Sequence, residues 1–421
     1  MTHPLRASPA LAIRIFLAFA FAYFFSALLR AVTATLAPAF SNELGLQAAD
    51  LGLLAGAYFL GFSALQLPLG QALDRLGPKR VLLLLTSLAV LGCGAFAMAK
   101  SLPGLILARM LIGMGLAAGL MAPLTCFRLR FSQGAQFRSN SWMLMSGSMG
   151  MVASTLPVQW LLPVWGWRGL FWVLAACLVA AMALIAWWVP ADPPLSARAP
   201  APAAPGPAPA QGYRDVFRHP VFVRSMPIGF FTYGGMIAVQ TLWAGPWMTR
   251  LAGFTPDQAA AGLFAINLCM LVAFMSWGLL MPRLARAGVS AHRLMCWGLP
   301  LHLLLLAWIV VDPQPATAVG WALWCVSCTF VSLSQPAVGQ AFPAALAGRA
   351  LSAFNLIIFS GVFSIQWCIG LAIDGLRRAG LSEASSFRLA FAMFGICCLV
   401  SYIWYLRPLG RRLSTASPLS P

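Results

Sequence analysis

The stretch GQALDRLGPKRV, residues Gly70–Val81, lies between two long apolar runs and carries four charged residues within seven positions. In the whole chain of 421 residues, only 9% are charged and 61% are hydrophobic. A soluble domain is about half apolar and about a quarter charged. The concentration of charge and glycine in so apolar a chain indicates a short loop between two membrane-spanning segments.

Apolar runs of 18 residues or more recur along the chain, and a helix of about 20 residues crosses a hydrocarbon core roughly 30 Å thick. The runs are continuous rather than alternating, so they predict helices instead of a barrel. The sequence therefore predicts an all-α membrane protein with twelve transmembrane helices. We expect the spans near 12–36, 50–72, 80–99, 103–126, 139–162, 168–189, 223–247, 258–281, 291–311, 316–340, 350–373 and 387–407.

The charge distribution predicts the topology. The chain has 27 lysines and arginines against 9 acidic residues, a net charge of +18. With the N-terminus in the cytoplasm, nineteen basic residues fall on the cytoplasmic side and six on the other, with Arg30 and Arg109 inside spans. This is the positive-inside bias, and it places both termini in the cytoplasm. Topology accounts for the charge, so we expect the bilayer as a partner and no nucleic acid.

The cysteines and histidines do not suggest a chemical centre. The ten cysteines fall almost entirely within predicted spans, so a disulfide framework is not expected. Cys325 and Cys328 have CxxC spacing in an apolar helix without companion histidines, which favours packing over metal binding. Four scattered histidines and few acids form no catalytic constellation. We expect no enzyme activity, no metal and no cofactor.

A Pro/Ala-rich segment divides the chain into two similar halves. Residues 191–222 have the composition of an extended linker, which leaves one six-span bundle at 1–190 and another at 223–421. Aligning Gly70 with Gly278 places Arg75 on Arg283. The same alignment sets Pro282 opposite Asp74. A degenerate repeat of this kind is typical of transporters with a substrate site between the halves.

The opening stretch resembles motif A of the major facilitator superfamily in residues, spacing and position between spans 2 and 3. RMLIGMGLAAG, from Arg109, resembles motif B of span 4, and GWRGLFW, from Gly166, resembles the usual start of span 6. The resemblance covers essentially the whole chain. It implies two six-helix bundles in a bacterial cytoplasmic (inner) membrane and a transport function.

The motif also predicts a cytoplasmic gate. Glycines permit close helix approach and tight turns, and a carboxylate at a helix end can bind the N-terminus of a neighbouring helix. By resemblance, that neighbour is the start of span 11, near Ala350. The alternative is a basic loop that only sets topology. The predicted gate residues are Gly70, Asp74, Arg75, Gly77, Lys79 and Arg80.

Arg30 is the strongest candidate for binding substrate. An intramembrane arginine is costly and indicates function, and no carboxylate is predicted at the depth of Arg30. Its planar guanidinium suits a carboxylate or a phosphate. The surrounding FFSALLRAVTATLAPAF resembles span 1 of the organophosphate:phosphate antiporter branch, in which an arginine binds the anionic group. That branch's second arginine is missing near Ile237, which favours a singly charged anion. Alternatively, Arg30 reaches out of the span or binds carbonyl groups.

The coupling of transport to an ion gradient has a weaker signal. By resemblance to motif B, Arg109 is the candidate for proton coupling. His302 and the substrate's own carboxyl group are alternatives, and exchange against a counter-substrate would need no proton.

Polar and aromatic residues within the spans are candidates to line the site, with helix–helix hydrogen bonds or aromatic packing as the alternative for each. The predicted substrate-binding residues are Arg30, Tyr58, Tyr233, Gln240, Trp243, Asn267, Gln335 and Asn355.

Together these patterns predict a secondary transporter that moves a small organic anion, a carboxylate or zwitterion, by alternating access. It would be coupled to protons or to exchange and would function as a monomer. An exporter of drug-, metabolite- or siderophore-like compounds and a transporter-like membrane sensor are the alternatives. Binding of anions would favour the first, and binding of cations or neutral compounds alone would favour the exporter.

Overall fold

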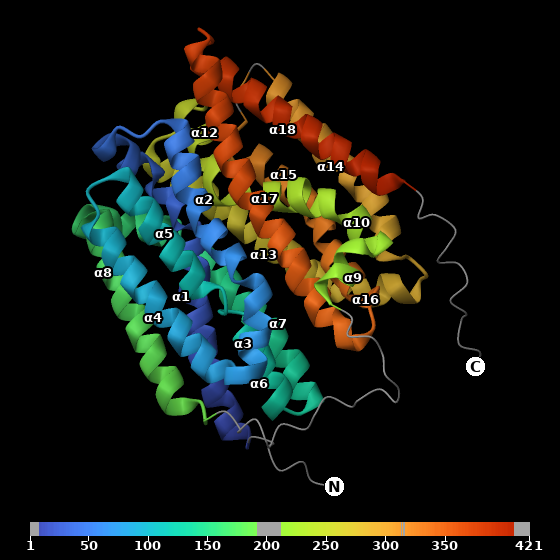
Figure 1. Cartoon of the computed structure of the whole chain (residues 1–421). Coiled ribbons are helices and arrows are strands. Elements are labelled where there is room, and N and C mark those ends of the chain that lie inside the picture. The colour runs from blue at the N-terminus through green and yellow to red at the C-terminus, as the bar shows by residue number, and fades with distance from the viewer. Residues whose placement is uncertain (1–7, 192–211, 313, 315, 408–421) are drawn as a thin grey trace.

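The computed structural model describes residues 8–191, 212–312, 314 and 316–407, and every regular element in these ranges is helical. Figure 1 shows two adjoining groups of helices, coloured blue to green and yellow-green to red. The predicted linker falls mostly on residues 192–211, outside the described ranges. The first group contains α1 (Pro9–Leu44), α2 (Ala48–Ala64), α3 (Gln66–Leu76), α4 (Pro78–Met98), α5 (Leu102–Leu116), α6 (Met121–Arg130), α7 (Gln133–Ala153) and α8 (Leu156–Trp188).

The second group is more irregular, because two of its spans contain π-helical or 3₁₀ segments. It contains α9 (Tyr213–Arg218), α10 (Pro220–Pro227), the π-helix η2 (Ile228–Tyr233), α11 (Gly234–Ala238), the π-helix η3 (Val239–Trp243), α12 (Ala244–Arg250), α13 (Pro256–Arg286), α14 (Ala291–Val311), α15 (Ala318–Cys328), the 3₁₀ helix η4 (Thr329–Leu333), α16 (Ser334–Gln340), α17 (Ala344–Arg378) and α18 (Glu383–Leu406).

The all-helical fold class is confirmed for the described residues. Nine of their helices are long and apolar enough to cross a membrane, or ten if α2 and α3, bent by 46° at their junction, form one span. α8 changes direction at Gly166, where φ is 61°, and Pro220–Arg250 is divided into five consecutive pieces. The count of twelve spans therefore stays a prediction.

The motif A stretch ends one helix and begins the next. Gly77 adopts φ 86°, a conformation that favours glycine, and Pro78 starts α4 with its preset φ. Around Gly70, by contrast, no atom of the described chain lies within 4 Å of the position that a Cβ would take. The sharp turn is formed, while the close helix approach expected at Gly70 is not.

The two groups meet most closely along α2 and α17, which lie side by side (Figure 1). A Cβ added at Gly52 would overlap the carbonyl of Gln366, and one added at Gly370 would overlap the carbonyl of Ala48. The absence of side chains at these two glycines lets the helices approach to backbone contact. This contact joins the first part of α2 to the last part of α17.

Candidate substrate cavity

A cavity of about 580 Å³ lies between the two groups of helices. On α1 its lining runs from Tyr23 to Arg30, and on α17 from Leu351 to Phe359. It therefore lies beside the middle of α1 and the first half of α17, away from the glycine contact between the first part of α2 and the last part of α17. Its polar and aromatic lining residues are Tyr23, Arg30, Phe62, Gln66 and Ser148 from the first group, and Tyr233, Gln240, Asn267, Phe274, Ser332, Gln335, Asn355 and Phe359 from the second.

Several lining residues lie on the irregular helices. Tyr233 ends the π-helix η2, Gln240 lies in the π-helix η3, and Ser332 lies in the 3₁₀ helix η4. A π or 3₁₀ turn rotates the following side chains relative to a regular α-helix, and such turns are frequent at functional sites. The irregular backbone of the second group thus sets the direction of its polar side chains into the cavity.

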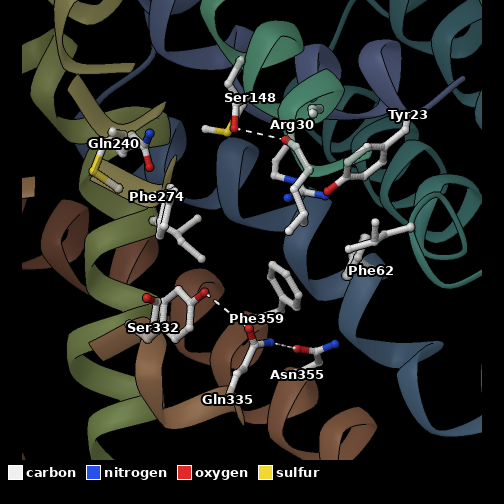
Figure 2. Close-up of a pocket in the computed structure, with 18 of the residues that line it drawn as sticks. Tyr23, Arg30, Phe62, Ser148, Gln240, Phe274, Ser332, Gln335, Asn355 and Phe359 are labelled. Carbon is white, nitrogen blue, oxygen red and sulfur yellow. Dashed lines mark hydrogen bonds between the residues drawn. The ribbon is translucent and has the colours of Figure 1, made fainter. Parts of the chain in front are cut away.

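Arg30 brings a positive charge to the cavity wall. Its guanidinium carbon lies 5.6 Å from the ring centroid of Phe62 and 5.8 Å from that of Phe359, and the Tyr23 hydroxyl lies beside it (Figure 2). Arg30 forms no ion pair within the described part of the chain, and its buried Nε makes no hydrogen bond there. A partly buried charge without a carboxylate partner on a cavity wall favours an anionic ligand.

Two amide pairs lie on the second group's side. Gln335 Nε2 donates to Asn355 Oδ1 at 2.6 Å, and the Tyr233 hydroxyl donates a long hydrogen bond of 3.5 Å to Gln335 Oε1. Gln240 Nε2 donates to Asn267 Oδ1 at 2.9 Å, and Asn267 Nδ2 donates to the carbonyl of Leu263. Both amides of the second pair donate a hydrogen bond to the described protein, whereas in the first pair Asn355 donates none.

Arg109 is buried in the first group and does not line the cavity. Its Nη1 donates to the carbonyl of Leu29 at 2.9 Å and its Nη2 to the hydroxyl of Thr33, while its guanidinium lies over the Tyr58 ring. Leu29 and Thr33 flank Arg30 along α1. Arg109 therefore fixes the segment of α1 that presents Arg30.

At the motif A end, Lys79 binds the end of α8. Lys79 Nζ donates to the carbonyls of Ala186 and Val189, at 2.8 and 2.5 Å, where the negative end of the α8 dipole lies. The Tyr213 hydroxyl of α9 donates to the carbonyl of Leu67 in α3 at 3.2 Å, across the two groups. Burial raises the pKa of the Tyr213 phenol, so it remains a donor at neutral pH.

The opposite end is closed by a carboxylate. Asp374, in α17, is 6% exposed and accepts hydrogen bonds from the N–H groups of Ala48 at 3.3 Å and Ala49 at 2.7 Å. These are the first two residues of α2, where the positive end of the helix dipole lies. The contact ties the second group to the first beside the glycine packing of α2 and α17.

The sequence model of the Major Facilitator Superfamily matches residues 19–366. This chain belongs to the Major Facilitator Superfamily. It is therefore a multi-pass membrane protein of a transporter family, and the predicted resemblance at family level is confirmed.

Solved transporter structures share the fold along nearly the whole chain. The D-xylose–proton symporter is 13% identical, with a TM-score of 0.75, over 94% of this chain and 98% of the other. A bacterial homologue of the human lysosomal transporter Spinster is 16% identical, with a TM-score of 0.72, over 95% and 97%. The nucleoside transporter NupG is 14% identical, with a TM-score of 0.69, over 94% and 100%.

One characterised relative matches over a shorter segment. The 4-hydroxybenzoate transporter PcaK of Acinetobacter baylyi is 28% identical over 159 residues. The match covers 37% of this chain and 34% of the relative, so it spans about a third of that protein's length.

Most of the predicted substrate-binding residues lie at one cavity. Tyr58 and Trp243 do not line it: Tyr58 packs against Arg109, and buried Trp243 donates its indole N–H to the carbonyl of Gln366 at 3.2 Å. His302, buried in α14, does not line it either. The predicted residues that do are Arg30, Tyr233, Gln240, Asn267, Gln335 and Asn355.

Sequence reasoning missed several lining residues of this superfamily member. Tyr23 lies seven residues before Arg30, two turns along the same helical face, and Phe359 lies four residues after Asn355. Helical spacing from the predicted residues would have found both. The same spacing leads to Phe62, four residues after Tyr58, and to Phe274, seven residues after Asn267, although apolar aromatics also occur throughout the packed interior.

Proposed function

We propose that the protein is a secondary transporter of a small organic anion with one carboxylate. The observation that carries this proposal is the position of Arg30, a cation without an ion pair in the described chain, on the wall of a cavity between the two groups. One guanidinium balances one negative charge and binds a carboxylate through two parallel hydrogen bonds.

Two further observations support an aromatic carboxylate. Rings of Tyr23, Phe62, Phe274 and Phe359 surround the space beside Arg30, and such walls favour a flat apolar body. The substrate in the name of the matched relative, 4-hydroxybenzoate, has this chemistry. The likeness of the Arg30 segment to the organophosphate:phosphate antiporter branch stays a prediction.

In transport by alternating access, the two ends of the cavity would close in turn. In this proposal, Asp374 and the α2–α17 contact close the outer side while the cavity faces the cytoplasm. Motif A would close the cytoplasmic side in the opposite state, with Asp74 at the end of α3 binding the start of α17. α2–α3 and α17 would then carry one carboxylate latch at each end of the pair.

The proposed topology joins shorter helices into twelve spans. α7 and the first part of α8 would form span 5, the rest of α8 span 6, α10 to α12 span 7, and α15 to α16 span 10. Both termini would lie in the cytoplasm of a bacterium, and one chain would suffice for transport. Coupling to protons through Arg109, or to a counter-substrate, belongs to the same proposal.

The test is thermal stability of the purified protein against carboxylates, phosphate esters, organic cations and neutral compounds. A ligand that binds the folded state raises Tm by mass action. We expect an aromatic carboxylate to raise the Tm of the wild type and of Arg378→Gln, which removes an exposed charge at the end of α17, but not of Arg30→Gln. If only cations or neutral compounds raise Tm, the anion proposal fails and the exporter alternative is favoured.

A further inference from the structure

We propose that Tyr233, Gln335 and Asn355 form a second recognition site in the cavity, selective for anions with a hydrogen-bonding oxygen at the end opposite the carboxylate. The inference rests on the proposed function, in which Arg30 binds the carboxylate. It adds that the second group of helices binds a different part of the same substrate molecule.

The two sites face the same space from opposite groups of helices. Figure 2 shows Arg30 on one side, the Gln335–Asn355 pair on the other, and the Phe359 ring between them. The Phe359 centroid lies 5.8 Å from the Arg30 guanidinium carbon, and Asn355 precedes Phe359 by one turn, about 6 Å along α17. This separation suits one aromatic ring with substituents at opposite positions.

The space between the two sites is bounded by rings. Phe62 from α2 and Phe359 from α17 pack with centroids 4.5 Å apart, and Phe274 from α13 lines the cavity as well. Aromatic walls contact a flat ring over a large area and offer no hydrogen bond to a polar middle section. A ligand with its polar groups at both ends matches this order of charged, apolar and polar surfaces.

The hydrogen bonds of the trio leave donors available to the ligand. Gln335 donates one N–H to Asn355 Oδ1, and Tyr233 donates its hydroxyl hydrogen to Gln335 Oε1. The Asn355 amide has two N–H donors, neither of which is used by another described residue, and the side chain is only 7% exposed. Buried donors facing a cavity favour a ligand that supplies an acceptor, such as a phenolic hydroxyl.

The Gln240–Asn267 pair provides an internal comparison. It lines the same cavity, but Asn267 donates to the Leu263 carbonyl and accepts from Gln240. Asn267 therefore uses one of its two N–H donors within the described protein, whereas Asn355 uses neither. Selectivity for the second polar group is therefore assigned to Tyr233, Gln335 and Asn355, and the Gln240–Asn267 pair is left out of it.

The experiment compares the affinities of benzoate, 4-hydroxybenzoate and 2-hydroxybenzoate by calorimetry or ligand-induced Tm shift. In the wild type we expect 4-hydroxybenzoate to bind roughly tenfold more tightly than benzoate, a difference of about 1.4 kcal/mol that one matched hydrogen bond can supply. We expect no such gain for 2-hydroxybenzoate, whose hydroxyl lies next to the carboxylate. Asn355→Leu and Gln335→Leu should bring the 4-hydroxybenzoate to benzoate ratio close to one. The control Gln159→Leu, at a buried amide of α8 that does not line the cavity, should keep the ratio.

The outcomes separate this inference from the proposed function. If Asn355→Leu and Gln335→Leu bind benzoate but keep the tenfold preference, the second site is wrong and the anion proposal stands. If Arg30→Gln still binds both acids, the proposed function is wrong. Equal affinity of the wild type for the three acids overturns the inference. This measurement needs no variant, so it tests the inference even if the variants fold poorly.

Discussion

The carboxylate of Asp374, near the end of α17, accepts a hydrogen bond from the backbone N–H of Ala49 in the first turn of α2 at 2.7 Å. It joins the two halves of the sequence through a side chain and a helix terminus rather than through an ion pair. Because the carboxylate also accepts from Ala48, two of the four N–H groups that a helix start leaves open are satisfied by the other half of the protein.

Neutralising Asp374 should weaken the outer closure. Asp374→Asn keeps the size of the side chain but removes the charge that interacts with the α2 dipole, at an expected loss of about 1–3 kcal/mol. We expect a lower Tm in the absence of ligand. The control is Asp312→Asn, since that carboxylate accepts a local hydrogen bond from Gln314. Equal Tm values for the two variants would contradict a closing role for Asp374.

The glycine contact between α2 and α17 should be intolerant of a methyl group. Gly370→Ala places a Cβ against the Ala48 carbonyl, so the helices must separate. We expect spin labels at Gln47 and Arg377 to report a longer mean distance. Gly375→Ala, on the same helix but with no atom within 4 Å of the added Cβ, should leave the distance distribution unchanged. An unchanged distance in both variants would show that the contact does not determine the spacing.

Loss of Arg109 should act through α1. Arg109→Gln removes the hydrogen bonds to Leu29 and Thr33, so we expect a lower Tm and an anion affinity reduced by tenfold or more, as hydrogen bonds from charged groups contribute about 1.5–3 kcal/mol. Lys100→Gln, at an exposed position, is the charge control. The pH dependence of transport then tests the coupling proposal: a profile that keeps its shape indicates positioning, and a flattened profile indicates coupling.

His219 should make stability depend on pH. Its ring packs against Phe342 with centroids 4.4 Å apart, and burial lowers its pKa below the ordinary value of about 6.5. The unfolded chain therefore binds the proton more readily. The stability that neutral His219 contributes is complete above about pH 6.5 and decreases as the pH falls through its lowered pKa. We expect Tm to fall more between pH 7 and pH 5 in the wild type than in His219→Gln; parallel curves would argue against this.

The sequence predicted the features that depend on local chemistry. Gly77 forms the turn that its spacing in motif A implied, and Arg30 lines a cavity, as a charge in an apolar span must find a polar surrounding. The four predicted amide side chains also line the cavity, because an amide in an apolar span needs a polar surrounding. Six of the eight predicted binding residues therefore lie at the cavity wall.

Features that depend on the pairing of distant helices could not be predicted. The contact of Asp374 is one such feature, because nothing in the sequence near it shows that α2 begins beside it. The π-helical segments that direct Tyr233 and Gln240 arise from a shift in backbone hydrogen bonding that residue patterns do not encode. Trp243 has the same polar and apolar parts as a ligand-stacking tryptophan, but its indole N–H is bound by Gln366.

α17 is a continuous helix of 35 residues without an internal proline, and it carries Asn355 at the cavity and Asp374 at the closed end, about 28 Å apart. A helix of this length behaves as a stiff lever. Any tilt of α17 that draws Asn355 across the cavity toward Arg30 must also move Asp374 along or away from the start of α2. A ligand that binds Asn355 therefore also changes the contact between Asp374 and the start of α2.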